Sequence, residues 1–335
     1  MPRQKYKTSK TQKVGIIGVG RYLPKKKLTN RDLEKMVDTS DEWIFTRSGI
    51  KERRIVAKGQ AASDLAISAA KDALKDAGLS PTQIDLIIVA TISPDMHFPS
   101  TACLVQKALG ASQAACFDIS AACAGFVYAI IIAQQFISQG TYKNALVIGV
   151  EVLSSITDWQ DRSTCVLFGD GAGACVLSTV KSGGILSTYM GSDGTKDNLL
   201  YMPAGGSRQP ASVETVKNRL HFIKMQGNEL FKLAVKIMAD AANQALKLAG
   251  LTCKDVDCFI PHQANIRILN AVANRLGLDL KRIYFNIERY GNMSSASTAV
   301  ALAEAVKKGK IKKGNIVVLD AFGSGLVWGA CVIKW

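Results

Sequence analysis

The sequence predicts an α/β protein made of two similar halves, and three observations support this prediction. Apolar strand-like runs alternate with long helical patterns along the chain. The segment ALKDAGLSPTQIDLIIV, starting at Ala73, returns as ALKLAGLTCKDVDCFIP, starting at Ala245. The segment FGDGAGACVL, starting at Phe168, returns as FGSGLVWGACVI, starting at Phe322. Both echoes keep their order, which a chance likeness between two amphipathic helices does not explain.

Six apolar runs are the expected strands, and they cover residues 13–20, 85–92, 145–152, 256–262, 282–288 and 315–322. The two repeated helices end at Gly78 and Gly250, each before a short loop into a strand. Long helices between strands favour parallel pairing, and ligands then gather at the carboxyl ends of the strands. We place a boundary within residues 179–184, which divides the chain into halves 1–180 and 181–335.

Composition places the chain among soluble globular proteins. Hydrophobic residues make up 48% of its 335 residues and charged residues 21%, so a large core can form. No apolar run reaches the roughly 18 residues that a membrane span needs. The basic residues 1–13 have no apolar segment of the signal-peptide kind behind them, and we expect them to precede the first strand. These features predict a cytoplasmic protein that does not enter a membrane.

The eight cysteines and three histidines exclude two other classes of protein. No CxxC pair occurs, and a disulfide framework is not expected in a long chain without an export signal. With so few histidines and no ligand-like cluster, a metal site is not expected either. Most of the cysteines lie in apolar runs and are interpreted as buried thiols.

The formal net charge of +15 suggests an acidic partner, although a solvated basic surface would also explain it. Part of this charge lies in the Lys-rich stretch 306–314. No nucleic-acid-binding signature accompanies the charge, so nucleic acid is not expected as a partner. A phosphate-bearing cofactor or an acidic protein remains open.

Cys123 differs from the other cysteines in its position. It follows the strand-like residues 114–119 and begins a helical pattern, residues 120–140, that is apolar nearly all round and is therefore expected to be buried. A helix start favours a thiolate, and its free N–H groups can hold an oxyanion. The neighbouring alanines and Gly125 leave room for a substrate. From position alone, a nucleophile and a buried structural thiol remain equally open.

His262 and Asn292 lie at comparable positions in the second half. His262 follows the expected strand 256–262, and Asn292 lies between the expected strand 282–288 and a helix expected from Thr298. A structural histidine and a helix N-cap are the alternative interpretations. Since strand ends meet in a doubled fold, we expect Cys123, His262 and Asn292 to converge near its pseudo-dyad.

Three glycine-rich segments are interpreted as turns. Residues 169–174 (GDGAGA) lack the Lys-Ser/Thr pair of a phosphate loop and are expected to form a tight turn before a strand. Residues 18–20 (GVG) are expected to turn at a strand end. Residues 322–325 (FGSG) follow an expected strand and can present backbone N–H groups to a site.

Taken together, the motifs closely resemble those of the bacterial β-ketoacyl-[acyl carrier protein] synthase III family. The resemblance runs in order from about Val14 to Trp335. It rests on DTSDEWIFTRSGIKERR (38–54), DISAACAGF (118–126), FGDGAGA (168–174), PHQANIRI (261–268), GNMSSAS (291–297) and AFGSGLVWG (321–329).

The resemblance implies the thiolase fold, with two α/β halves related by a pseudo-dyad and layered α-β-α-β-α. It makes Cys123 the nucleophile and His262 and Asn292 its partners. Related condensing enzymes that extend long chains carry a second histidine where this chain has Asn292. Thiolases carry a second catalytic cysteine near Phe322. Both differences favour the type III family.

The resemblance also implies binding roles. Trp43 and Arg162 match residues that flank the adenine of coenzyme A, and Arg47 and Asn265 match its other contacts. The residues that match the acyl carrier protein surface are Lys232, Arg267 and Arg275. Backbone N–H groups of Cys123 and Ser324 match the oxyanion hole, although the commoner residue at position 324 is Gly. Phe98 matches a residue that enters the acyl pocket of the partner subunit in a homodimer, and does not by itself fix the starter.

The expected reaction starts fatty acid synthesis. Cys123 takes an acyl group from a short acyl-coenzyme A, most simply acetyl-coenzyme A, and the acyl group condenses with malonyl-acyl carrier protein as carbon dioxide leaves. This chemistry requires no metal and no redox cofactor. Three alternatives remain: a papain-like hydrolase, a related acyl transferase that does not condense, and a non-catalytic acyl-coenzyme A-binding protein.

Overall fold

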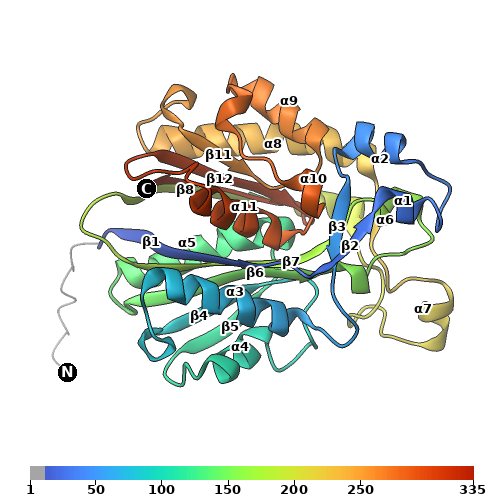
Figure 1. The fold of residues 1–335 in the computed structure, drawn as a ribbon, viewed down its shortest axis with the longest axis horizontal. Helices are drawn as coiled ribbons and strands as arrows, with labels where there is room; N and C mark the ends of the chain where they lie inside the picture. Colours follow the sequence, from blue (N-terminus) through green and yellow to red (C-terminus); the bar gives the residue numbers. More distant parts are fainter. Residues whose placement is uncertain (1–11) are drawn as a thin grey trace.

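The computed structural model describes residues 12–335, so most of the basic stretch 1–13 lies outside the described residues. Figure 1 shows five layers. The outer layers are α8 (Gly227–Leu248) with α9 (Ile266–Leu276), and α3 (Ala62–Ala77) with α4 (Thr101–Leu109). Helices α5 (Gly125–Ser138) and α11 (Ser295–Lys307) lie between two sheets. The predicted α-β-α-β-α layering is confirmed.

The first sheet has the strand order β1-β7-β6-β4-β5. Strand β4 pairs in parallel with β5 and β6, and β7 pairs antiparallel with β6 and β1. These strands are β1 (Val14–Tyr22), β4 (Leu86–Ala90), β5 (Ala115–Ile119), β6 (Asn144–Val152) and β7 (Asp170–Thr179).

The second sheet has the order β11-β12-β13-β8 and the same sequence of pairings, parallel and then twice antiparallel. Its strands are β8 (Gly184–Ser192), β11 (Cys258–Pro261), β12 (Ile316–Gly323) and β13 (Val327–Lys334). The counterpart of β5 is reduced to one parallel bridge between Phe259 and Ile283.

The expected strand at residues 282–288 is therefore wrong. A 3-10 turn (Leu280–Arg282) and the short helix α10 (Ile287–Tyr290) occupy the two ends of this stretch, and between them strand pairing is limited to the bridge at Ile283. The buried Gln263 side chain gives the physical reason: its Oε1 accepts hydrogen bonds from the backbone N–H groups of Asn286, at 3.0 Å, and Ile287, at 3.3 Å. A side chain thus satisfies backbone donors that a sheet ladder would otherwise take.

Two of the expected glycine turns are also wrong, because residues 18–20 lie inside β1 and residues 170–174 lie inside β7. A Cβ atom on Gly20 would lie 2.2 Å from the backbone N of Ala73 in α3. A Cβ atom on Gly173 would lie 2.5 Å from the Cβ of Ala299 in α11. These glycines let helices pack directly against the strand backbone, which the sequence pattern alone did not distinguish from a turn.

Three apolar clusters hold the layers together. The largest fills the space between the sheets around α5 and α11, and the others lie beneath α8 and α9 and beneath α3 and α4. Helix ends follow the sequence: Gly78 and Gly277, both with positive φ, end α3 and α9, and the Asn265 side chain caps the start of α9.

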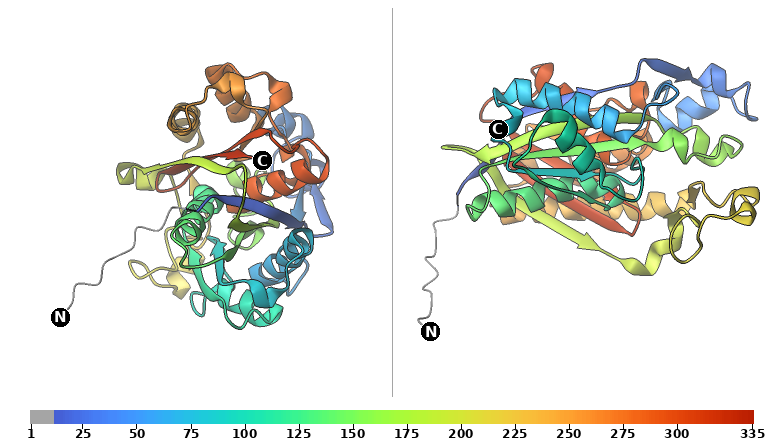
Figure 2. Two further views of the ribbon diagram at one scale, coloured as in Figure 1. Left: turned by 90° about the vertical axis from the view of Figure 1, so that its left-hand side faces the viewer. Right: turned by 90° about the horizontal axis from the view of Figure 1, so that it is seen from below.

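The remaining elements gather at the end of the molecule away from the C-terminus, as Figures 1 and 2 show. They are β2 (Lys26–Thr29), β3 (Glu52–Ile55), α1 (Asn30–Leu33), α2 (Asp41–Ser48), α6 (Arg162–Cys165), β9 (Leu200–Tyr201), α7 (Val213–Lys217) and β10 (Lys224–Met225). Among them, α2, α6, β9 and β10 contribute residues to the lining of the candidate site.

Candidate active site

Cys123 lies in a 3-10 turn, Ala122–Ala124, between β5 and the start of α5, as the sequence predicted. The preceding residue, Ala122, has φ 43°, so the chain bends sharply there. Cys123 is only 7% exposed. A Cβ atom on Gly323 would lie 2.6 Å from its backbone N, so the turn after β12 packs directly on the cysteine.

His262 follows the last residue of β11, also as predicted. Its backbone N–H donates to the carbonyl of Asp320 in β12 at 2.7 Å, which fixes the chain at the strand end. The side chain is buried, and burial lowers the pKa of the imidazole to about 3. The ring is therefore neutral at physiological pH and can donate a hydrogen bond from one nitrogen.

Asn292 follows α10 rather than the expected strand, and α11 begins at Ser295 rather than Thr298. Its backbone is fixed by hydrogen bonds to Leu167, at 2.9 Å, and Gly169, at 3.0 Å. The side-chain Oδ1 accepts from the Ser294 N–H at 2.8 Å. Since Ser294 is the N-cap position, Asn292 is not the N-cap of this helix, and its NH₂ group is the donor left for other partners.

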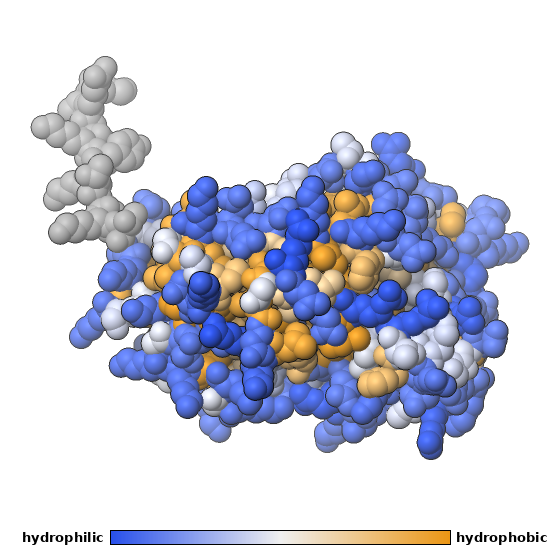
Figure 3. All heavy atoms as spheres, turned by 90° about the horizontal axis from the view of Figure 1, so that it is seen from above, coloured by the Kyte–Doolittle hydropathy of each residue, from blue (hydrophilic) through white to orange (hydrophobic). Residues whose placement is uncertain are grey.

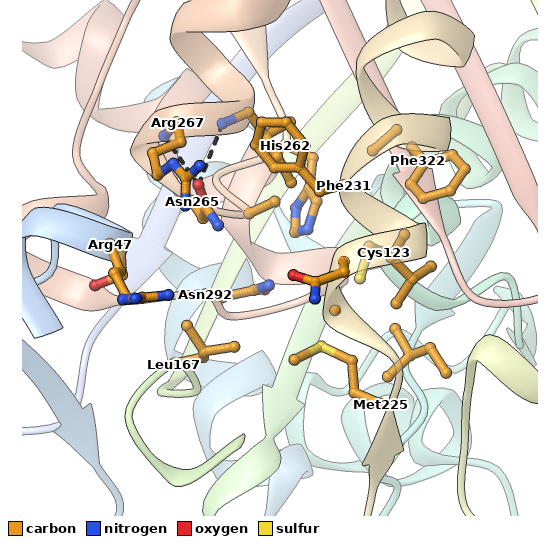
Figure 4. Close-up of a pocket in the computed structure, with 18 of the residues that line it drawn as sticks. Arg47, Cys123, Leu167, Met225, Phe231, His262, Asn265, Arg267, Asn292 and Phe322 are labelled. Carbon is orange, nitrogen blue, oxygen red and sulfur yellow. Dashed lines mark hydrogen bonds between the residues drawn. The ribbon is translucent and has the colours of Figure 1, made fainter. Parts of the chain in front are cut away.

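The three side chains converge. Cys123, His262 and Asn292 all line one cavity of about 630 Å³. Figure 4 shows this cavity, with Arg47 and Arg267 on one side of the view and Cys123 and Phe322 on the other. The expected meeting of three segments from the two halves is thus observed, although Asn292 reaches it from a helix end and not from a strand end.

Trp43 lies at the outer part of this cavity with Arg47 and Asn265, which also line it. The guanidinium carbons of Arg47 and Arg162 each lie 5.0 Å from the centroid of the Trp43 ring. Arg162 does not line the cavity itself, but it lies beside the Trp43 ring, which does. Asn265 accepts hydrogen bonds from the N–H groups of Arg267, at 2.9 Å, and Ile268, at 3.2 Å.

The three basic residues of the expected carrier-protein surface differ in whether they line the cavity. Lys232 and Arg267 line the same cavity, and Arg267 lies over the ring of Phe231 at 5.3 Å. Arg275 does not line the cavity and forms an ion pair with Asp240 in α8 at 3.7 Å. Figure 3 views this side of the molecule, where hydrophilic side chains surround apolar patches.

A second cavity of about 370 Å³ meets the first at Cys123, which lines both. Its lining is mostly apolar and includes Ile92, Leu153, Ile156, Phe168, Leu200, Tyr201, Met202, Ile223 and Val327. Ser324 lines this second cavity. Phe98 is 84% exposed and lines neither cavity of its own chain.

Comparison with known proteins agrees with this geometry. The family model described as 3-oxoacyl-[acyl-carrier-protein (ACP)] synthase III matches residues 117–194, and the model of its C terminal matches residues 246–335. The beta-ketoacyl-[acyl-carrier-protein] synthase III of Caldanaerobacter subterraneus subsp. tengcongensis is 61% identical over 322 residues, which cover 96% of this chain and 97% of that protein. This chain belongs to the β-ketoacyl-[acyl-carrier-protein] synthase III family.

Solved structures support the same fold. The 3-oxoacyl-[acyl-carrier-protein] synthase III from Aquifex aeolicus VF5 is 50% identical, with a TM-score of 0.89 over 96% of this chain and 100% of that one. The priming beta-ketosynthase of the R1128 polyketide pathway is 34% identical, with a TM-score of 0.92 over 99% of each chain. The predicted thiolase fold is confirmed, and the chain is a condensing acyltransferase that initiates fatty acid synthesis.

Within this synthase III site, burial raises the pKa of the Cys123 thiol to about 12, and the Ser294 hydroxyl opposes that shift. The Glu151 carboxyl, which is fully buried, raises the same pKa further. Glu151 accepts hydrogen bonds from the Ser93 hydroxyl at 2.6 Å and the Ser295 hydroxyl at 2.9 Å. Burial and the nearby carboxyl both favour the neutral thiol, so the thiolate is a small fraction of the free enzyme at neutral pH.

Two residues of the site, Ser294 and Glu151, were not predicted from the sequence. Glu151 gave a usable signal, because it is the one charged residue in the apolar run 144–152 and such a residue needs buried partners. Ser294 gave none, since its position depends on a backbone conformation, φ 44°, that the motif does not reveal.

Two features are absent from the described residues, a metal-binding cluster and a membrane-spanning helix. Within residues 12–335, no group of three or more His, Cys, Asp or Glu side chains could hold a metal ion. In the same part of the chain, no helix combines the length and apolar character that crossing a bilayer requires.

Proposed function

We propose that Cys123 first takes the acyl group of a short acyl-coenzyme A and then passes it to the carbanion of decarboxylated malonyl-acyl carrier protein. The position of Cys123 carries this proposal, because its thiol lies where two cavities meet. One cavity has a basic, aromatic outer part suited to a nucleotide thioester, and the other is apolar and suited to an acyl chain.

In the first half-reaction, the Cys123 thiolate attacks the thioester carbonyl and coenzyme A leaves as its thiol. Trp43 and Arg162 hold the adenine, and Arg47 and Asn265 contact the rest of the coenzyme. The backbone N–H groups of Cys123 and Ser324 stabilise the tetrahedral oxyanion, each worth about 10²–10³ in rate. The contact of Gly323 with Cys123 supports this role, since it places the turn that carries Ser324 beside the nucleophile.

In the second half-reaction, His262 and Asn292 donate hydrogen bonds to the malonyl thioester carbonyl. The bond to the carboxylate carbon breaks, carbon dioxide leaves, and the electron pair forms an enolate that attacks the acyl-Cys123 carbonyl. The products are 3-oxoacyl-acyl carrier protein and free Cys123. A neutral, buried imidazole and an amide with a free NH₂ group support donor roles for these two residues. The carbanion arises by decarboxylation, so this step needs no resident cofactor.

The acyl carrier protein docks on the basic surface that includes Lys232, Arg267 and Arg275. Lys232 and Arg267 border the first cavity, through which the carrier's substrate arm must reach Cys123. The net charge of +15 favours association with an acidic protein.

The working form is a homodimer in the cytoplasm, with Phe98 of one subunit closing the acyl cavity of the other. Phe98 supports this arrangement, because its side chain is 84% exposed and lines neither cavity of its own chain, so it is accessible to another subunit. The boundary within residues 179–184 then separates a half that carries the nucleophile from a half that carries the two donors. Acetyl-coenzyme A is the simplest starter for an acyl cavity of about 370 Å³ that Phe98 narrows further.

The deciding experiment measures carbon dioxide release from malonyl-acyl carrier protein with and without prior acylation of Cys123. We expect release together with 3-oxoacyl product only from the acylated enzyme. Acylation without carbon dioxide release would identify an acyl transferase that does not condense, and hydrolysis would identify a hydrolase. A competition among acetyl-, butyryl- and isobutyryl-coenzyme A then identifies the starter.

A further inference from the structure

We propose that the hydroxyl of Ser324 fixes the wall between the two cavities and thereby limits the size of the acyl group that Cys123 accepts. The inference rests on the proposed function, because it takes the second cavity as the acyl site. It concerns a specificity-determining side chain and is separate from the backbone N–H of the same residue.

The wall is the ribbon of β9 and β10. Leu200 in β9 lines both cavities, Tyr201 lines the second, and Met225 in β10 lines the first. Only two residue pairs join the strands, Lys224 with Tyr201 and Met225 with Leu200. Two-stranded ribbons of this length are barely stable alone, so the position of this wall depends on contacts with the rest of the protein.

Ser324 supplies such a contact. Its hydroxyl donates a hydrogen bond to the carbonyl of Leu200. The same turn exchanges two backbone hydrogen bonds with Asp193: the Asp193 N–H donates to Leu326 at 2.9 Å, and the Leu326 N–H donates to Asp193 at 2.7 Å. The turn therefore bonds to both ends of segment 193–200. At the Leu200 end, which lines the cavities, the bond is the one that the Ser324 hydroxyl donates.

The other side of the turn is fixed by Cys123. Gly323 is so close to the cysteine backbone that the turn has no room to move toward it. The hydroxyl thus joins a fixed point at the nucleophile to a short ribbon that bounds the acyl cavity.

The test uses two substitutions of Ser324. Ser324→Ala keeps the Cβ atom and removes only the hydroxyl, and Ser324→Gly removes both. Ser187→Ala is the matched control, because the Ser187 hydroxyl also donates to a backbone carbonyl, that of Ala245 at 2.6 Å, but lines neither cavity. For each protein, mass spectrometry follows Cys123 acylation by acetyl- and butyryl-coenzyme A in competition.

We expect the butyryl-to-acetyl ratio of acylation rates to rise about tenfold in both Ser324 variants and to stay unchanged in Ser187→Ala, since a methylene in a pocket is worth a factor of about 10–200. The ratio cancels any shared change in the oxyanion hole. A rise in Ser324→Gly alone would assign the effect to the Cβ atom and overturn the proposal. An unchanged ratio in both variants would overturn it as well.

A second measurement reports on the wall directly. Hydrogen exchange of the amides in residues 199–202 and 224–226 should be faster in Ser324→Ala than in the native enzyme, and unchanged in Ser187→Ala. Unaltered exchange there would also overturn the proposal. Failure of the proposed function looks different, because the native enzyme would then show either no acylation of Cys123 by any acyl-coenzyme A or no carbon dioxide release from malonyl-acyl carrier protein.

Discussion

The two halves of the molecule share one frame and differ at the residues that face the site. Both sheets have the same order of pairings, and both central helices follow a residue with positive φ, Ala122 at 43° and Ser294 at 44°. The next residue is Cys123 in the first half and Ser295 in the second. Cys123 borders two cavities, whereas Ser295 is fully buried and donates to Glu151 and to the carbonyl of Ala90.

The residues that contact Cys123 and Ser295 also differ between the two halves. Gly323 packs against Cys123, and Glu151, at the corresponding place in β6, bonds to Ser295. A glycine leaves the first helix start open to substrate, and a hydrogen-bonded carboxyl closes the second. The comparison teaches that duplication supplies two equivalent corners, and that side chains at a few positions make one corner reactive and the other structural.

The largest expected effect comes from replacing Cys123, the reactive residue of the first half. Cys123→Ser should lower acyl-enzyme formation at least about 10³-fold, as removal of a catalytic nucleophile does elsewhere, and leave the fold intact. Mass spectrometry after mixing with acetyl-coenzyme A checks this. Cys253→Ser is the control, because Cys253 is partly exposed and lines neither cavity. An acetyl adduct on any cysteine other than Cys123 would contradict the assignment.

The next prediction concerns His262 and Asn292, the two proposed donors of the second half. His262→Ala and Asn292→Ala should each lower malonyl decarboxylation about 10²–10³-fold and leave Cys123 acetylation nearly unchanged, since both act as donors to the second substrate. The two half-reactions are measured separately on each variant. Decarboxylation at the native rate in either variant would remove that residue from the mechanism.

The pH dependence of the half-reactions should differ in the same way. Because the pKa of His262 is lowered to about 3, its protonation does not change between pH 5 and 8, and decarboxylation should show no inflection from it there. The pKa of Cys123 is raised to about 12, so the thiolate fraction, and with it acetylation, should increase about tenfold per pH unit over the same range. An acetylation rate independent of pH would show that substrate binding lowers this pKa.

A smaller effect distinguishes the two partners proposed to use the first cavity, coenzyme A and acyl carrier protein. Arg267→Glu should raise the KM for malonyl-acyl carrier protein roughly tenfold, more strongly at low salt, and spare acetylation. Trp43→Ala should weaken coenzyme A and spare the carrier protein. Lys107→Glu in α4, on the opposite outer layer, carries the same charge change as a control. Equal loss in both half-reactions would indicate damaged folding instead.

The smallest effect concerns stability. The register of the strands places Asp320 where the first half has Ile148, since each pairs with the alanine of an ACV motif, Ala330 or Ala174. Asp320 is fully buried, and within the described residues neither carboxyl oxygen has a hydrogen-bond partner. Burial raises the pKa of this carboxyl well above its usual value.

The folded protein therefore keeps the Asp320 proton while the unfolded chain loses it above about pH 4. Stability falls as pH rises, and the near-isosteric Asp320→Leu should stabilise the protein by about 1–3 kcal/mol at pH 8 and by less at pH 4. Urea unfolding at both pH values measures this difference. Asp320→Asn, which cannot ionise, should lose only the pH-dependent part. A Leu variant that is less stable at both pH values would mean that the carboxyl has a partner.

The sequence predicted most of the architecture because the strand and helix periods are strong and the doubling repeats them. It also placed Cys123 and His262 correctly, since each follows a clear strand. The strand before Asn292 could not be excluded, because Gln263, more than twenty residues away, takes the backbone bonds that a strand would use. The glycines of β1 and β7 were misread for a similar reason: their partner is a helix elsewhere in the chain.

The roles of the site residues stay predictions from the resemblance, and the structure adds their surroundings. The guanidinium carbon of Arg162 lies 5.0 Å from the centroid of the Trp43 ring, and Arg275 forms an ion pair with Asp240. Neither arrangement has a sequence signal, because both depend on how separate helices pack. Ser294 was missed for the same reason, whereas Glu151 could have been recognised as the one charged residue in the apolar run 144–152.

Leu200 lines both cavities, so a displacement of this residue that enlarges one cavity reduces the other. A bulky acyl group that pushes this side chain outward gains room only by shrinking the space for the second substrate. Under the proposed function, a starter that is too long would load Cys123 and then obstruct malonyl-acyl carrier protein. Long starters would then be rejected at the condensation step even where acylation of Cys123 succeeds.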